Sequence, residues 1–215
     1  MSPQAAALPV WLEVLAMCVI GAVGAAIARR REAQIYGTLF AGIVVGLGGG
    51  MVRDVLLNTR PVAIANWVYI PSVLAAAVIG ALAYGFLTTR LPVFVFVQGL
   101  ALGLLVTIGC QRALDLGVPV PSVLLLGLLT ATAGGIILDA MSARRSSVIS
   151  TKVGWMASAL FIGAVVFWLL SDYVSFPVAV VACVVVVTAL RVLTVERGWP
   201  APEWPTGNGS EEAAS

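Results

Sequence analysis

Apolar residues dominate the chain in seven long runs, separated by short polar connections. Each run has about 18 or more residues with few charges, and the hydrocarbon core of a bilayer needs about 20 apolar residues per helix. The runs therefore predict seven membrane-spanning helices, at residues 8–28, 35–57, 67–87, 93–110, 123–141, 153–170 and 174–195. Since the connections leave no room for a soluble domain, residues 1–195 form one predicted transmembrane domain.

Composition supports an all-α integral membrane protein. Hydrophobic residues make up 60% of the 215 positions and charged residues only 10%, so polar side chains could not cover the surface of a water-soluble fold. The first run has no basic residues before it and precedes three arginines, which indicates a retained helix and not a cleaved signal. Residues 198–215 are rich in Pro, Gly, Ser and Glu and predict a disordered tail.

The reactive residue types are scarce. Cys18, Cys110 and Cys183 fall within or at the ends of predicted helices, where a thiol packs as a small hydrophobe. Histidine, the usual general base and nitrogen ligand for metals, is absent. A net charge of +2 is too small to imply a nucleic-acid partner. We therefore expect neither an enzyme nor a metal site nor a cofactor.

Basic residues are distributed unevenly between the two ends of the predicted helices. Nine fall on one side of the membrane and three on the other, and the basic side is usually cytoplasmic. This bias predicts an outside N-terminus and a cytoplasmic C-terminus. The nine are Arg29, Arg30, Arg31, Arg90, Arg144, Arg145, Lys152, Arg191 and Arg197, and the three are Arg53, Arg60 and Arg112.

Two glycine-rich segments, residues 46–54 and 130–139, predict an internal duplication. At an offset of 85 positions, two glycines and an aspartate of one segment align with two glycines and an aspartate of the other. The units span about residues 8–90 and 93–171, and each has three helices, so the second crosses the membrane inverted relative to the first. The seventh helix lies outside the duplication. Inverted repeats with matching glycine interruptions are typical of transport proteins.

These segments also supply the candidate site. Glycines in a membrane helix allow close helix packing, but three in a row are expensive in a helix interior. We therefore favour a kink or unwound turn whose free carbonyls face protein or water. Thr132, Gly135, Asp139 and Ser142 share one helical face. The residues predicted to line a pore or ion pathway are Gly48, Gly49, Gly50, Arg53, Asp54, Thr132, Gly134, Gly135, Asp139 and Ser142.

Charged residues at these positions have two interpretations. An intramembrane charge is costly unless it faces a polar cavity or a partner, but each of these also lies near a predicted helix end, where a structural ion pair or snorkelling would suffice. Arg53 and Asp54 are adjacent and do not share a helical face, so each is expected to find its partner elsewhere. Asp139 has no basic residue on its own face and is expected to face a cavity.

Small residues on the first and fourth predicted helices indicate close helix packing, within one subunit or between subunits. Gln98 is expected to hydrogen-bond across a helix contact, since exposure to lipid would be costly. The residues assigned to a possible oligomer interface are Gly21, Ala25, Gln98, Gly99 and Gly103.

The sequence Gly-Gly-Gly-Met-Val-Arg-Asp at residues 48–54, followed by Arg-Pro-Val at 60–62, resembles the signature of a bacterial family of duplicated three-helix units. That family is related to the trimeric intracellular cation (TRIC) channels. In the second unit Ala133 replaces the first glycine and Leu138 stands in place of the arginine. The resemblance implies a homotrimer in the inner membrane, with one hydrophilic pore per subunit between bent second and fifth helices. It also implies permeant potassium or sodium and a bound lipid.

Two functions follow from these patterns. The leading hypothesis is a passive monovalent cation channel, with potassium as the permeant ion that the resemblance implies. The acid of the second unit, which has no arginine beside it, suits a cation path better than an anion path. The alternative is a secondary transporter of a small solute such as glycine, since inverted repeats also suit alternating access. A purely structural membrane protein stays open as a third possibility.

Overall fold

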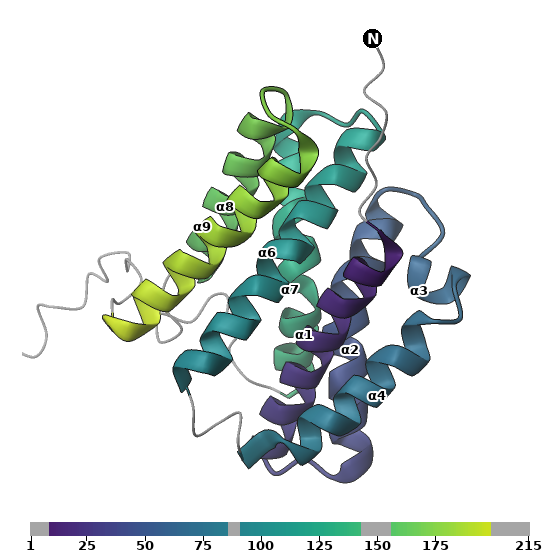
Figure 1. Ribbon diagram of the computed structural model, residues 1–215. Helices are drawn as coiled ribbons and strands as arrows, with labels where there is room; N and C mark the ends of the chain where they lie inside the picture. The colour runs from purple at the N-terminus through teal and green to yellow at the C-terminus, as the bar shows by residue number, and fades with distance from the viewer. Residues whose placement is uncertain (1–8, 86–90, 143–155, 199–215) are drawn as a thin grey trace, which may run out of the picture.

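The computed structural model describes residues 9–85, 91–142 and 156–198, and all regular structure in these segments is α-helical (Figure 1). The helices are α1 (Val10–Arg30), α2 (Ile35–Leu56), α3 (Val62–Ala65), α4 (Tyr69–Leu82), α6 (Leu91–Asp115), α7 (Val120–Met141), α8 (Met156–Ser171) and α9 (Phe176–Glu196). The predicted all-α membrane fold is confirmed. The predicted tail lies outside the described residues from position 199 onward, as do Arg90, Arg144, Arg145 and Lys152.

Each of the seven predicted helices has a counterpart in the described segments. Five are long and apolar enough to cross a bilayer, whereas α4 and α8 are shorter, with 14 and 16 residues. The fourth predicted helix ends too early, because α6 continues past Cys110 through a polar last turn to Asp115. An α-helix can continue with polar side chains once it has passed out of the hydrocarbon core of the bilayer. The four-residue α3 was missed altogether.

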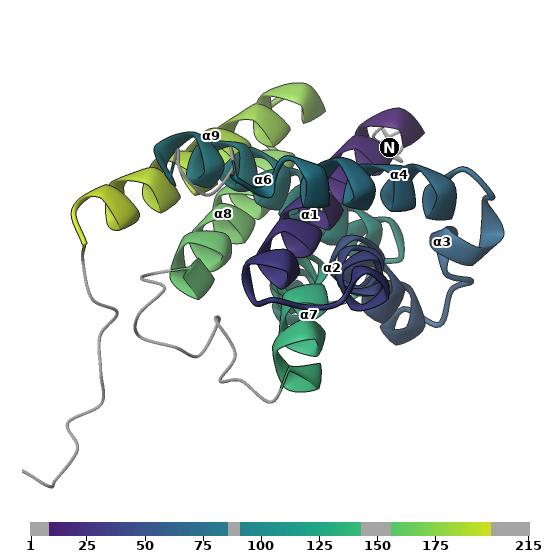
Figure 2. The same cartoon turned by 90° about the horizontal axis from the view of Figure 1, so that it is seen from below.

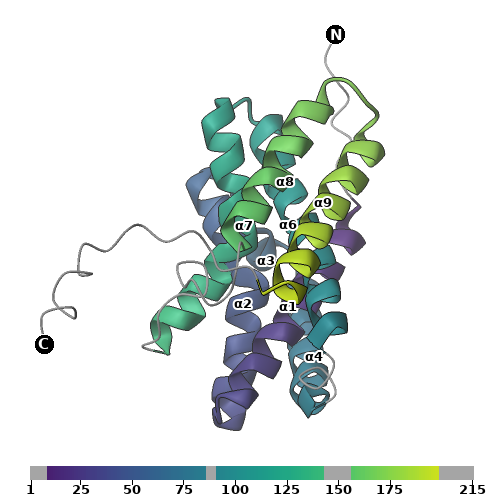
Figure 3. The same ribbon diagram turned by 90° about the vertical axis from the view of Figure 1, so that its left-hand side faces the viewer.

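The helices pack in two groups that meet along α2 and α7. α1 packs against α2 and α4, and α6 packs against α7 and α9, while α1 also contacts α6. Figure 2, which looks up the bundle, places α1, α2 and α7 centrally, with α3 and α4 on one flank and α8 and α9 on the other. In Figure 1, α1 begins in the upper half of the bundle and α9 ends at its left side. In Figure 3, α2 and α7 run in opposite directions.

The expected unwound turn at the glycines is wrong, because α2 and α7 are continuous helices through Gly48–Gly50 and Gly134–Gly135. The three consecutive glycines instead give α2 three small positions at successive angles around the helix. A Cβ on Gly48 would lie 3.2 Å from Gly134 Cα, and one on Gly49 would overlap the carbonyl oxygen of Thr130. Gly50 faces α1, where a Cβ would lie 2.7 Å from Met17 Cε. Close approach of backbones explains the glycines.

Four of the five residues assigned to a subunit interface are buried inside the chain, so that assignment is wrong for them. Gly21 lies against Val73 of α4 and the carbonyl oxygen of Gly42 in α2. On the other flank, Gly99 and Gly103 meet backbone atoms of α9, at 3.1 Å from Thr188 Cα and 2.8 Å from Val184 Cα. Ala25 is fully buried. These small residues pack against other helices of the same subunit and are not available for contacts between subunits.

The expectation for Gln98 is confirmed in one respect. Its side-chain oxygen accepts a hydrogen bond from Arg191 of α9, with an N···O distance of 3.0 Å. The bond crosses a helix contact, as predicted, but the partner lies in the seventh helix of the same chain. Gln98 therefore stabilises α6 against α9.

We expect Gly49→Ala to destabilise the protein by about 1–3 kcal/mol, because the added methyl group overpacks the contact with the Thr130 carbonyl. The matched control is Gly135→Ala, where no atom lies within 4 Å of the new Cβ. That variant should be neutral or gain up to about 1 kcal/mol of helix propensity. Unfolding of purified protein in detergent measures both. Equal effects of the two substitutions would contradict the close backbone contact.

Candidate functional site

A cluster of charged side chains is buried where α1, α2 and α4 converge. Arg53, in the last turn of α2, is the largest fully buried side chain among the described residues. Its Nε donates to Asp54 Oδ1 at 2.8 Å and an Nη donates to Glu13 Oε1 at 3.2 Å. The prediction that each of the two residues has a partner elsewhere is confirmed for Arg53 by Glu13, but the two also pair with each other, because the long arginine side chain reaches back to the adjacent carboxylate.

Glu13 of α1 is a central member of this cluster, and the sequence analysis missed it. Its second oxygen accepts a hydrogen bond from the Tyr69 hydroxyl at 3.0 Å and lies 3.7 Å from a guanidinium nitrogen of Arg112. Glu13 is only 3% exposed, whereas the Arg112 side chain is 48% exposed. A signal was present: a single acid within an apolar run is costly in hydrocarbon and needs a named partner.

Asp54 connects the cluster to the turn that follows α2. Its second oxygen accepts the Val62 backbone N–H at 2.9 Å, and its carbonyl oxygen accepts the Thr59 hydroxyl at 3.1 Å. Asn58 turns the chain with a φ of 53°, in the left-handed region that asparagine tolerates. One buried carboxylate thus places both Arg53 and the first residue of α3.

The second aspartate lies at the opposite end of the α2–α7 contact. Asp139, in the last turn of α7, is 3% exposed, and its Oδ1 lies 3.0 Å from an Nη of Arg31, the residue that follows α1. The expectation that Asp139 would face a cavity is not supported by this burial and pairing. Because α2 and α7 are antiparallel, the two aligned aspartates mark two ends and not one shared centre.

The predicted polar face of α7 runs from the protein interior to its surface. Thr132 is buried, and its hydroxyl donates to the carbonyl oxygen of Leu128 at 2.8 Å. Gly135 is half-buried with open space where a side chain would stand. Beyond Asp139, Ser142 is exposed and donates to the carbonyl oxygen of Leu138. At Gly135, a Cβ would meet no other atom within 4 Å, so this part of the face is not filled by a neighbouring helix.

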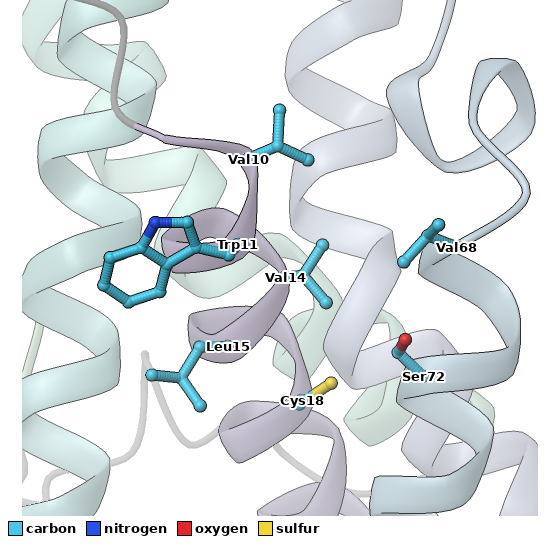
Figure 4. A pocket seen from close by; sticks show the side chains of 7 residues that line it. All are labelled: Val10, Trp11, Val14, Leu15, Cys18, Val68 and Ser72. Carbon is cyan, nitrogen blue, oxygen red and sulfur yellow. The ribbon is translucent and has the colours of Figure 1, made fainter.

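The described residues also form an apolar groove between the start of α1 and α4 (Figure 4). It has a volume of about 380 Å³ and is lined by Val10, Trp11, Val14, Leu15, Cys18, Val68 and Ser72. It contains no charged side chain, so its chemistry does not suit an ion. Within the described segments, no three Cys, Asp or Glu side chains are arranged to hold a metal.

Comparison with protein families gives a match to the model described as "Glycine transporter". It matches twice, at residues 10–88 and 95–172, and the two segments begin 85 positions apart. Two curated relatives are a UPF0126 membrane protein of Deinococcus radiodurans and the UPF0126 inner membrane protein YadS of Escherichia coli. The first is 28% identical over 76% of each chain, and the second is 27% identical over 73% of this chain and 75% of YadS.

Solved structures of TRIC channels share the fold. One, from a study of conductance through TRIC cation channels, superposes with a TM-score of 0.82 at 24% identity, covering 91% of this chain and 97% of the channel. The TRIC orthologue from Rhodobacter sphaeroides gives 0.79 at 25% identity, covering 88% and 98%. A prokaryotic TRIC channel in 0.5 M KCl gives 0.77 at 18% identity, covering 87% and 95%. The resemblance that the sequence motif predicted is confirmed.

We expect Arg53→Met to cost about 3–5 kcal/mol of unfolding free energy, because it leaves the Glu13 and Asp54 carboxylates buried without their guanidinium. Arg112→Met is the matched control and should cost less than about 1 kcal/mol, since that side chain is half exposed and its contact is long. Reversible unfolding in mixed micelles measures the difference. Similar costs for the two arginines would show that burial does not set the strength of this cluster.

Proposed function

The chain belongs to the glycine-transporter family of membrane proteins, and from this membership and its shared fold with TRIC channels we propose that it is a passive cation channel. The observation that carries the proposal is the match to the Rhodobacter sphaeroides channel, which extends over nearly the whole of that channel at 25% identity. The expected potassium selectivity and homotrimeric assembly are part of the proposal. So is a multi-pass location in the inner membrane with a cytoplasmic C-terminus, in keeping with the name of the Escherichia coli relative.

The proposed ion path follows the contact between α2 and α7 within each subunit. Three observations support this location. The two helices are antiparallel and meet through glycines, the face of α7 bearing Thr132 has open space at Gly135, and a carboxylate stands at each end of the contact. Polar groups at membrane depth are tolerated where they line a water-filled cavity or are buried in protein.

The conformation described here corresponds to a closed path. A Cβ on Gly134 would lie 2.5 Å from the Val45 carbonyl oxygen, so no hydrated cation passes between the two backbones at that crossing. Conduction requires α2 and α7 to separate there. Glycine faces suit such a movement, because they carry no interlocked side chains that must unpack first.

Carboxylates stand at both ends of the proposed path. In the cluster around Arg53, Glu13 and Asp54 face the buried Arg53 and the half-exposed Arg112. At the other end, Leu138 stands where the first unit has arginine, so the arginine paired with Asp139 is Arg31, from the end of α1. Carboxylates attract cations and repel anions most strongly in a site with a low local dielectric. A lipid head group beside the path remains an expectation from the family resemblance.

We expect purified protein in planar bilayers to give single-channel potassium currents, and Asp139→Asn to lower the unitary conductance by at least about twofold. One unit charge near a permeant ion contributes several kcal/mol at an intermediate dielectric, so its removal should be visible in a current. Asp115→Asn, an exposed acid at the end of α6, is the matched control and should leave the conductance unchanged.

Flux into vesicles separates this proposal from the transporter alternative, which the family name alone favours. A channel gives potassium flux that does not saturate at low millimolar concentrations and needs no solute. Saturable uptake of glycine without single-channel events would overturn the channel proposal. If both Asp139→Asn and Asp115→Asn conducted like wild type, Asp139 would be removed from the path.

A further inference from the structure

An ion pair between Arg31 and Asp139 links residues 108 positions apart and brings the end of α1 to the end of α7. In the first repeat, Arg53 supplies the guanidinium to the neighbouring Asp54 from the same helix. In the second repeat, leucine occupies the position equivalent to Arg53. Asp139 is thus paired with an arginine from the other repeat, and this contact crosses between the two halves of the molecule.

Local structure presents Arg31 to the end of α7. Its backbone N–H bonds to the carbonyl oxygens of Ile27 and Ala28, which closes α1. Glu32 then adopts a φ of 61°, in the left-handed region, and turns the chain toward α2. The guanidinium therefore projects from a tight interhelical turn, at the side of the bundle where α2 begins and α7 ends.

The two ion pairs differ in how firmly they are held. Arg53 and its carboxylate partners have side chains no more than 4% exposed, whereas the Arg31 side chain is 24% exposed. Nη1 of both arginines has no hydrogen-bond partner among the described atoms, so the two pairs differ in exposure and not in this respect. Breaking an ion pair that is exposed to water costs much less free energy than breaking one that is fully buried. Of the two, the Arg31–Asp139 contact is the more exposed and is therefore held less strongly.

We propose that Arg31 is a releasable latch at the inner end of the α2–α7 contact. When closed, its guanidinium occupies Asp139 as an internal cation and holds α7 against the turn between α1 and α2. When this contact opens, the turn between α1 and α2 no longer holds the end of α7, which can then separate from α2. This inference rests on the proposed channel function, because it names the residue that regulates the same path.

The test compares Arg31→Gln with Arg30→Gln in single-channel recordings of the full chain. Arg30 is the adjacent, exposed arginine and provides a control with the same loss of charge. We expect Arg31→Gln to raise the open probability at least about fivefold, as loss of about 1 kcal/mol from the closed state predicts, while Arg30→Gln stays at the wild-type value. Arg31→Lys keeps a cation and should stay near wild type. Asp139→Asn should combine a raised open probability with a lowered unitary conductance.

Hydrogen–deuterium exchange gives a readout that does not require conduction. Arg31→Gln should speed amide exchange in residues 136–141 relative to Arg30→Gln, because the latch no longer holds that end of α7. Unchanged exchange would overturn the latch whatever the currents show. Faster exchange with an unchanged open probability in a conducting protein would overturn its gating role. If the wild-type protein does not conduct, the channel proposal fails first and the gating role fails with it, while exchange still reports on the contact.

Discussion

The burial of one guanidinium constrains the rest of this structure. Arg53 is completely enclosed, and an unpaired charge in such a place would cost several kcal/mol, so carboxylates must be delivered to it. Glu13 comes from α1 and Asp54 from α2, while Tyr69 of α4 bonds to Glu13 in turn. The register of three helices is thereby fixed at one point. The turn into α3 is fixed as well, through the Val62 amide.

A second constraint is the direct approach of α2 and α7. Hydrocarbon solvates a leucine as well as a protein interior does, so helices in a membrane associate through close packing and polar contacts instead of hydrophobic burial. Gly48, Gly49 and Gly134 supply that packing by letting backbone meet backbone. A contact of this kind is tight but has no interlocked side chains. Such a contact suits two helices that pack together in one state and separate in another.

The two repeats differ in the residues that pair with their buried polar side chains. At the offset of 85 positions, Gln98 stands where Glu13 stands, and Leu138 stands where Arg53 stands. The acceptor at position 98 receives its arginine from α9, and Asp139 is paired with Arg31 of the first repeat. In the first repeat, the buried carboxylates pair with Arg53 of the same repeat. In the second repeat, the arginine partners come from α9 and from the first repeat. Because of this asymmetry, the seventh helix helps to stabilise the second repeat, and the Arg31 side of the ion pair with Asp139 is partly exposed.

The sequence by itself determined the membrane class, the seven helices and the family. A bilayer forces every backbone polar group to bond within its own segment, so length and apolarity decide a spanning helix without reference to its neighbours. It also located the glycines, Arg53 and both aspartates. Only the tertiary structure decided what they meet: Arg53 with Glu13, 40 positions away, and Asp139 with Arg31, 108 positions away. Glycine lowers the cost both of unwinding a helix and of close approach, and composition cannot distinguish the two. The neighbouring backbone decides, because it either fills the space beside the glycine or leaves it open.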